Sequence, residues 1–191
     1  MSMEQVIATV RGFDGALVFV PEPGGDFPEI AWGDAFFFYA PDGQLPHNVQ
    51  PYGTIVTKNH PDDATSDLDP PGRWRVNIHV DRPTFRELTG EDPRSLGRPR
   101  DHAATDSVMP HPVYGTLGWI CVVDPGGRTT ETVVRLLLDA HNAARRRYER
   151  RHGPEVREMP DEPPADAGSR TREPGGPALA EGTDSSAGTG G

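Results

Sequence analysis

Apolar and polar side chains alternate most regularly along RWRVNIHV, residues 73–80. Successive side chains of a strand point to opposite faces of a sheet, so this alternation predicts a strand with one apolar and one polar face. The polar face carries Arg75, Asn77 and His79. These three side chains could bind an anion or position a substrate carbonyl. The solvent-facing side of an ordinary antiparallel sheet gives the same alternation and is the more common reason for it.

Four further apolar segments predict strands of the same sheet. They are ALVFV (16–20), AFFFYA (35–40), YGTIVTK (52–58) and LGWICVV (117–123). The second segment ends on Pro41-Asp42-Gly43, which favours a hairpin turn. The last segment is apolar on both faces, which predicts a central strand with Trp119 in the core.

The chain opens on a helical pattern. Ser2 and Gln5 can form a capping box, and apolar side chains at helical spacing predict a helix over residues 3–11. Gly12 follows as a left-handed stop. The start of the chain therefore has its own complete set of helix signals.

Two more helices are predicted later in the chain. PTFRELTG (83–90) has proline at its start and glycine at its end, which indicates a short helix. The final helix begins near Thr129 or Thr130 and ends in a run of arginines. Residues 91–110 are polar and rich in proline, and we interpret them as a loop that acts as a lid or covers a sheet edge.

The resulting order is helix, four strands, helix, strand, helix. It predicts an α+β fold, a mainly antiparallel sheet of about five strands with the N-terminal and C-terminal helices packed on one face. Residues 1–153 form this single predicted domain. Residues 154–191 are acidic, rich in proline and glycine and devoid of aromatic side chains, so they are predicted to be a disordered tail.

Charge and composition narrow the classes of partner. The formal net charge is −10, and basic side chains gather only in the last helix, so binding to nucleic-acid phosphates is disfavoured. No apolar run approaches the roughly 20 residues that a membrane span requires, and no positively charged start followed by an apolar run suggests secretion. The single cysteine cannot form an intrachain disulfide. We therefore expect a soluble, cytoplasmic protein with no membrane partner.

Four segments in fixed order carry a family resemblance. They are FPEIAWGDAFFFYAPDG, QPYGTIVTKNHP, GRWRVNIHV and HPVYGTLGWICVVDPG, followed by a helix rich in alanine and arginine. Together they resemble a family of bacterial proteins that is known only as a domain of unknown function. More distantly, the first helix, the Trp32-Gly33-Asp34 segment and the closing strand and helix are similar to the YjbR-like family. That likeness implies a small α+β fold and a DNA-binding role, which the acidic composition disfavours.

His111 is the strongest single candidate for chemistry. It precedes Pro112 and Tyr114 at the entrance to the last strand, where a histidine could act as a general base. Such a role needs an orienting carboxylate, and the candidates are Asp106, Asp81 and Glu29. A turn histidine that bonds the neighbouring backbone is the more common arrangement.

The remaining motifs are weaker. Trp32 and Asp34 could frame a pocket, although Asp34 could equally cap a turn. Cys121 is predicted to be a buried thiol with a raised pKa. The histidine spacings match no metal motif, and no glycine-rich phosphate loop is present, so we expect neither a metal nor a cofactor. The sequence leaves open a site assembled from His79, His111 and a distant carboxylate.

These observations lead to one hypothesis and two alternatives. The leading hypothesis is a non-enzymatic binding or accessory domain for a small molecule or a protein. Its candidate surface contains Arg75, Asn77, His79, His111 and Tyr114, with Trp32 and Asp34 as further candidates. The alternatives are a small hydrolase or isomerase in which His111 or His79 is the general base, and DNA binding by analogy with the YjbR-like family.

Overall fold

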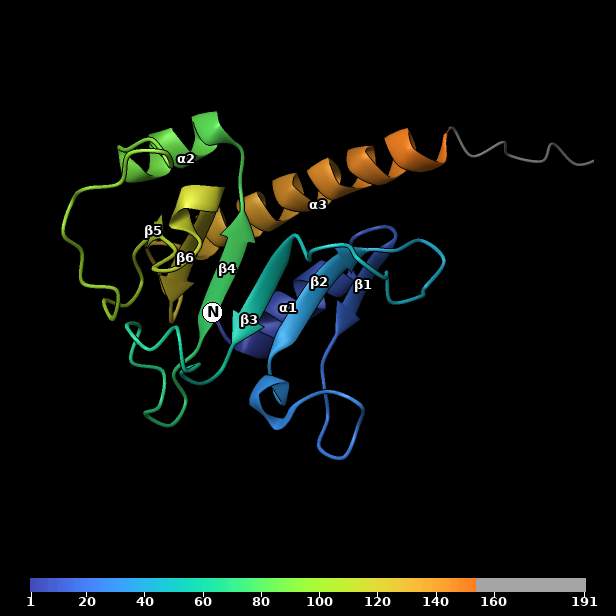
Figure 1. Cartoon of the computed structure of the whole chain (residues 1–191), viewed down its shortest axis with the longest axis horizontal. Coiled ribbons are helices and arrows are strands. Elements are labelled where there is room, and N and C mark those ends of the chain that lie inside the picture. The colour runs from blue at the N-terminus through green and yellow to red at the C-terminus, as the bar shows by residue number, and fades with distance from the viewer. Residues whose placement is uncertain (154–191) are drawn as a thin grey trace, which may run out of the picture. The chain divides into compact units, whose positions relative to one another are not determined.

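The structure is a computed structural model, and it describes residues 1–153. A six-stranded antiparallel sheet, in the order β1-β2-β3-β4-β6-β5, forms its centre (Figure 1). The elements are α1 (Met3–Arg11), β1 (Ala16–Phe19), η1 (Glu29–Ala31), β2 (Ala35–Tyr39), β3 (Gly53–Val56), β4 (Arg75–His79), α2 (Arg82–Thr89), β5 (Met109–Pro110), η2 (Gly115–Leu117), β6 (Trp119–Val123) and α3 (Thr130–His152). The predicted tail, residues 154–191, lies outside the described residues.

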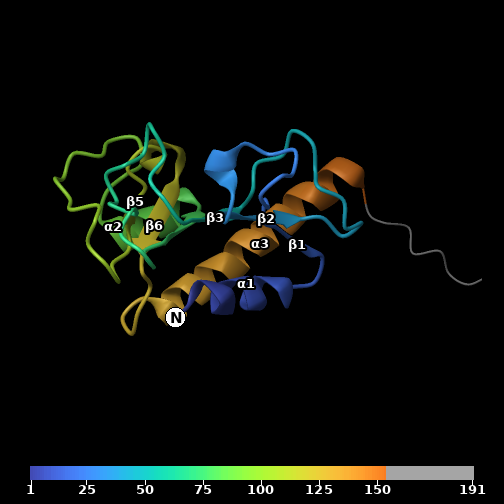
Figure 2. The same ribbon diagram turned by 90° about the horizontal axis from the view of Figure 1, so that it is seen from below.

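Helices α1 and α3 pack on the same face of the sheet, whereas loops cover the other face (Figure 2). The buried core lies between the two helices and the sheet, and it includes Val6, Val10, Phe37, Ile55, Val76, Ile78, Ile120, Val133, Leu136 and Leu137. This confirms the α+β fold with terminal helices on one face. None of the described helices is long and apolar enough to cross a membrane.

The face opposite the two helices is here called the helix-free face. Thr54 of β3, Asn77 of β4 and Cys121 of β6 lie directly opposite one another across neighbouring strands, so all three side chains point to this face. Arg75 lies two residues from Asn77 on β4 and shares its face. The alternation of residues 73–80 therefore predicted the two faces of the strand correctly.

The structure bears out several local predictions. The capping box of Ser2 and Gln5 begins α1, and Gly90 ends α2 in a left-handed conformation. Gly12, in contrast, has φ −77° and is right-handed, so the predicted left-handed stop is wrong. Backbone bonds from the Gly12 N–H to the last turn of α1 hold it in the helical region instead.

The sheet has one strand more than predicted. Met109 and Pro110 form β5, a two-residue strand on the edge beside β6, within the segment predicted as a loop. Proline has no N–H to donate and is tolerated only where a strand needs few ladder bonds, as at an edge. The segment does cover a sheet edge, as predicted, but it does so as a strand.

The last predicted strand begins two residues later than expected. Leu117 belongs to η2 and is 63% exposed, so the prediction that it starts a buried strand is wrong. Gly118 has φ 86° and ends η2 in a left-handed conformation, after which β6 begins at Trp119. Trp119 is only partly buried and does not belong to the core cluster, contrary to expectation.

Candidate functional site

A hollow of about 470 Å³ lies on the helix-free face. Its floor is formed by strand residues and its walls by the loops that follow β3 and β5. The lining residues are Phe36, Gln50, Pro51, Thr54, Val56, His60, Pro61, Asp62, Asp63, Arg75, Asn77, His111, Val113, Tyr114, Leu117 and Trp119. Four of the predicted candidates, Arg75, Asn77, His111 and Tyr114, are thereby brought together.

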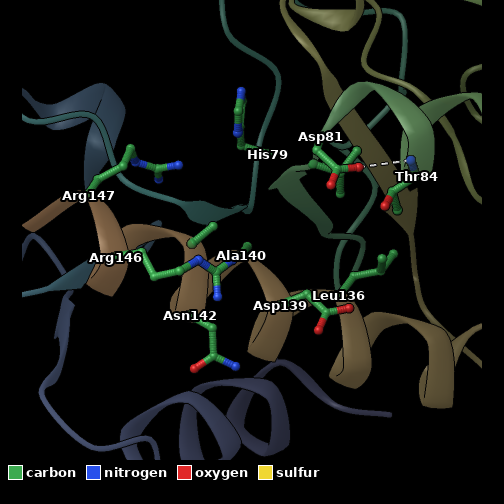
Figure 3. Close-up of a pocket in the computed structure, with 11 residues that line it drawn as sticks. His79, Asp81, Thr84, Leu136, Asp139, Ala140, Asn142, Arg146 and Arg147 are labelled. Atoms are coloured by element: carbon green, nitrogen blue, oxygen red, sulfur yellow. Dashed lines mark hydrogen bonds between the residues drawn. The ribbon is translucent and has the colours of Figure 1, made fainter. Parts of the chain in front are cut away.

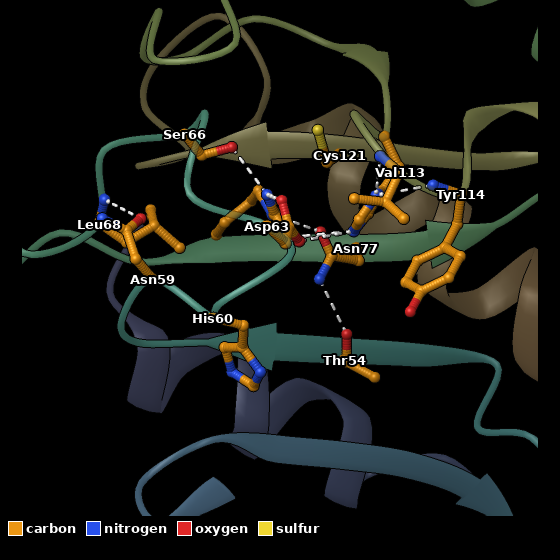
Figure 4. Close-up of polar contacts among 12 residues, drawn as sticks. Thr54, Asn59, His60, Asp63, Ser66, Leu68, Asn77, Val113, Tyr114 and Cys121 are labelled. Carbon is orange, nitrogen blue, oxygen red and sulfur yellow. Dashed lines mark hydrogen bonds and ion pairs between the residues drawn. The ribbon is translucent and has the colours of Figure 1, made fainter. Parts of the chain in front are cut away.

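Arg75 is the centre of the polar network below this hollow, and its side chain is 1% exposed. Figure 4 labels three of its hydrogen-bond partners, Asp63, Ser66 and Asn77. Its Nη1 donates to Asp63 Oδ1 at 3.1 Å and to Ser66 Oγ at 2.7 Å, and its Nη2 donates to Asp63 Oδ2. Its Nε donates to Asn77 Oδ1 at 2.8 Å, and Nη2 also lies 3.0 Å from His111 Nε2. The guanidinium is thus enclosed on every side by protein groups.

The network continues across the sheet to β3. Asn77 Nδ2 donates to Thr54 Oγ1 at 2.9 Å. The hydroxyl oxygen of Thr54 is therefore an acceptor in this bond, and its own hydrogen is left to donate elsewhere. Because Thr54 also lines the hollow, its floor carries a hydroxyl donor.

A tight turn brings Asp63 under Arg75. The backbone N–H of Asp63 donates to the carbonyl of His60 at 2.9 Å, which closes the chain over Pro61 and Asp62. Burial alone would raise the pKa of Asp63, but the hydrogen bond and charge of Arg75 outweigh it and hold that pKa below its usual value. Asp63 is therefore an anion that neutralises the buried guanidinium.

His111 is buried and is held by backbone groups of its own turn. Its Nδ1 accepts from the backbone N–H groups of Val113 and Tyr114 at 3.1 Å each. Its Nε2 faces Arg75 and lies 3.6 Å from Asp63 Oδ2. Burial and the charge of Arg75 lower the pKa of His111 to about 3. The ring is therefore neutral at pH 7, and both of its nitrogens face protein groups.

None of the three carboxylates suggested as a partner of His111 contacts it. Asp106 accepts from backbone N–H groups at the start of α3, and Asp81 caps α2. Glu29 begins η1 and is not among the residues that line the hollow. The carboxylate that approaches His111 is Asp63.

His79 points to the helix-free face but does not line the large hollow. Its ring packs edge-on against that of Trp119, with the centroids 5.6 Å apart. It borders a smaller hollow of about 300 Å³ between the end of β4, α2 and α3, where its imidazole points away from Asp139 and Asn142 (Figure 3). Burial, with the nearby charge of Arg147, lowers the pKa of His79.

In the Trp32–Asp34 segment, Trp32 and Asp34 have different contacts. Trp32 does not line the hollow, and its Nε1 donates to the carbonyl of Phe27 at 3.1 Å. Asp34 is fully buried and accepts from the backbone N–H and the hydroxyl of Thr57. Its other carboxylate oxygen, Oδ2, lies 3.1 Å from His60 Nε2. Asp34 therefore reaches the hollow through His60.

Sequence reasoning missed Asp63, Ser66, Thr54 and His60 as parts of the site. The loop NHPDDATSDLDPPG, which supplies three of them, has no periodicity that would place its side chains. Its density of Asp, Asn, Ser and His is the only signal that could have drawn attention to it. Within residues 1–153, no group of three or more His, Cys, Asp and Glu side chains is arranged to hold a metal ion.

Comparison with protein families decides where the chain belongs. A family model described as "Family of unknown function (DUF6194)" matches residues 1–153. The chain belongs to DUF6194. The predicted membership in a domain family of unknown function is thereby confirmed. No curated protein and no solved structure matches this DUF6194 chain, so nothing in the comparisons bears on the YjbR-like likeness or on bacterial origin.

Proposed function

We propose that the protein binds a small, uncharged molecule with an apolar body in the hollow on the helix-free face. The observation that carries this proposal is the combination of an apolar lining with a polar network, centred on Arg75, that holds the walls in place. A volume of about 470 Å³ lies within the range of roughly 300–1,000 Å³ typical of small-molecule sites.

The charges that line the hollow favour a neutral ligand over an anion. Arg75 is enclosed, and its charge is offset by Asp63. Asp62 adds a further carboxylate to the lining. An anion would therefore meet no accessible lysine or arginine among the lining residues, whereas a neutral acceptor could take the hydroxyl hydrogen of Thr54.

The exposed apolar side chains at the rim support a ligand with an apolar body. Val113, Tyr114 and Leu117 are all exposed, and they surround the same opening as Trp119. Aromatic and aliphatic walls with a few polar groups are the usual composition of small-molecule sites. The same rim would suit a protein partner, but a stable protein interface needs about 1,000 Å² or more of well-matched surface.

The other hypotheses have less support. His111 has both ring nitrogens occupied and His79 lies outside the hollow, so neither is placed to act as a general base there. DNA binding, which rests on the YjbR-like likeness, is disfavoured by the net charge of −10. Bacterial origin and a cytoplasmic location stay predictions.

A fragment screen followed by NMR tests the proposal. Neutral aromatic fragments should shift the backbone signals of Thr54 and Tyr114 and the indole signal of Trp119. Leu117→Asp places a charge at the rim. The fragment concentration needed to produce the same shifts should therefore rise at least about tenfold. Leu138→Asp, at a 43% exposed apolar position on α3, is the matched control. Equal effects of the two variants, or no shifts at these signals, would contradict the proposal.

A further inference from the structure

His60 and Asp34 form a second carboxylate–histidine contact at the hollow, separate from that of Asp63 and His111. Asp34 is 0% exposed, and its Oδ1 accepts from the Thr57 backbone N–H at 2.8 Å and from the Thr57 hydroxyl at 2.9 Å. Its Oδ2 lies 3.1 Å from His60 Nε2. The carboxylate is fixed by Thr57, so it can hold the imidazole in one orientation.

This contact determines which nitrogen of His60 is available. A carboxylate accepts a hydrogen bond, so the neutral imidazole carries its proton on Nε2 and has a lone pair on Nδ1. Among residues 1–153, no hydrogen bond to His60 Nδ1 is present. The side chain is 33% exposed and lines the hollow. His60 therefore differs from His111, whose two nitrogens both face protein groups.

A hydrogen-bond donor lies in the same hollow as this base. The Thr54 hydroxyl accepts from Asn77, so its hydrogen can be donated to a bound carbonyl oxygen. Figure 4 shows His60 and Thr54 both on the β3 side of the polar cluster. A base with a free lone pair, a donor for a developing oxyanion and an opening to water are the groups that acyl transfer to water requires.

We infer that His60 is a catalytic general base that, with Asp34 as its positioning residue, hydrolyses a small uncharged ester bound in the hollow. This inference rests on the proposed binding function. His60 Nδ1 takes a proton from water while the water oxygen forms a bond to the ester carbonyl carbon, and the carbonyl oxygen becomes an oxyanion near Thr54. The intermediate then expels the alkoxide as the C–O bond breaks, and the imidazolium returns its proton to that alkoxide. The products are a carboxylic acid and an alcohol, and no oxidant or reductant is needed.

Hydrolysis of 4-nitrophenyl acetate by the full chain tests this inference. His60→Gln keeps an amide N–H that can donate to Asp34 but has no basic lone pair, so kcat/KM should fall about 100-fold, within the usual contribution of a general base. His47→Gln removes an exposed histidine outside the hollow and should leave the rate unchanged. Equal rates for the wild type and His60→Gln would overturn the inference. A single release of nitrophenolate equal to the protein concentration, which indicates acylation without turnover, would overturn it as well.

Asp34→Asn tests the positioning role. An amide at this position can favour the wrong tautomer of His60, so kcat should fall at least about tenfold while KM stays unchanged. A rise in KM with unchanged kcat would contradict positioning. Should this variant fail to fold, the comparison of His60→Gln with His47→Gln still decides the inference.

A ligand that is not cleaved separates this inference from the binding proposal. The amide analogue 4-nitroacetanilide should shift the NMR signals of Thr54 and Trp119 in both the wild type and His60→Gln. Shifts without ester turnover would overturn the catalytic role and leave the binding proposal standing. The absence of shifts would overturn the binding proposal, and the catalytic role with it.

Discussion

Arg75 and Asp63 form a two-point ion pair beneath the hollow, with Nη1 donating to Oδ1 and Nη2 to Oδ2. The arginine comes from the middle of the sheet and the aspartate from the loop after β3. The pair therefore joins the floor of the hollow to one of its walls. It also leaves neither charge free, which is why the hollow suits an uncharged ligand.

Arg75→Met should destabilise the protein by about 3 kcal/mol or more, because it leaves a partly buried carboxylate without its counter-ion. Asp63→Asn should have an effect of similar size, since it leaves the buried guanidinium without its anion. The loss of stability in the double variant should be smaller than the sum of the two single losses, by about 1 kcal/mol or more, because its two replacements are both neutral. Urea unfolding at pH 7 measures all three free energies.

The control for this cycle is a surface ion pair. Arg135 and Asp139 lie one turn apart on α3, and both side chains are more than half exposed. Arg135→Ala should therefore change the free energy of unfolding by less than about 1 kcal/mol. Equal losses for Arg75→Met and Arg135→Ala would show that the buried pair does not hold the hollow together.

His111 should make the protein sensitive to mild acid. Its pKa in the folded state is about 3, against 6.5 for an unperturbed histidine. The unfolded chain therefore binds more protons between these values, and stability is lost as the pH falls from about 6.5 towards 3. Over the middle of this range, His111 alone should contribute a slope of about 1.4 kcal/mol per pH unit.

His111→Asn isolates this contribution. The asparagine oxygen can still accept from the backbone N–H groups of the turn, but the side chain does not titrate. The free energy of unfolding, measured in urea at pH 7, 6, 5 and 4, should fall less steeply for this variant than for the wild type. His47→Gln, at an exposed position, should keep the wild-type slope. A variant curve parallel to that of the wild type would contradict the assignment.

The alternation along β4 predicted the floor of the site, because strand periodicity is local. It placed Arg75 and Asn77 on one face, and the covering of the opposite face by α1 and α3 followed from their apolar stripes. It could not predict that His79 lies outside the hollow. That depends on the edge-on packing of its ring against Trp119, forty residues later in the numbering.

The walls could not be predicted in the same way, because they depend on contacts across loops. The contact of Asp63 with Arg75 requires the turn at Pro61, and that of His60 with Asp34 joins side chains 26 residues apart. Neither the loop that carries His60 and Asp63 nor the segment that carries Asp34 has a hydrophobic period. β5 escaped prediction for a related reason, since two residues ending in proline carry no strand pattern and pair only because β6 lies beside them.

Gly118→Ala should destabilise the protein by about 1–2 kcal/mol, because Gly118 has φ 86° and a side chain in this region is strained. The added Cβ would also lie 3.1 Å from the Val80 carbonyl oxygen, so the turn carrying Leu117 must move. Fragment binding at the rim should weaken as well. Gly127→Ala is the control, since that glycine has open space around it, and it should change stability by less than about 0.5 kcal/mol.

Cys121 should be inert in the folded protein. Its thiol is fully buried on β6, and burial raises its pKa to about 12 from 9.0. The thiolate is the reactive form, so its fraction at pH 8 should be about a thousandfold smaller than for an unperturbed thiol. With 5,5′-dithiobis(2-nitrobenzoic acid), the native protein should release almost no thionitrobenzoate over an hour, whereas protein unfolded in urea at the same pH should release one equivalent within minutes.

Rapid release from the native protein would mean that β5, whose Pro110 carbonyl accepts from the Cys121 thiol, separates readily from β6. The wall of the hollow beginning at His111 would then be mobile, and a rigid binding site there would be excluded.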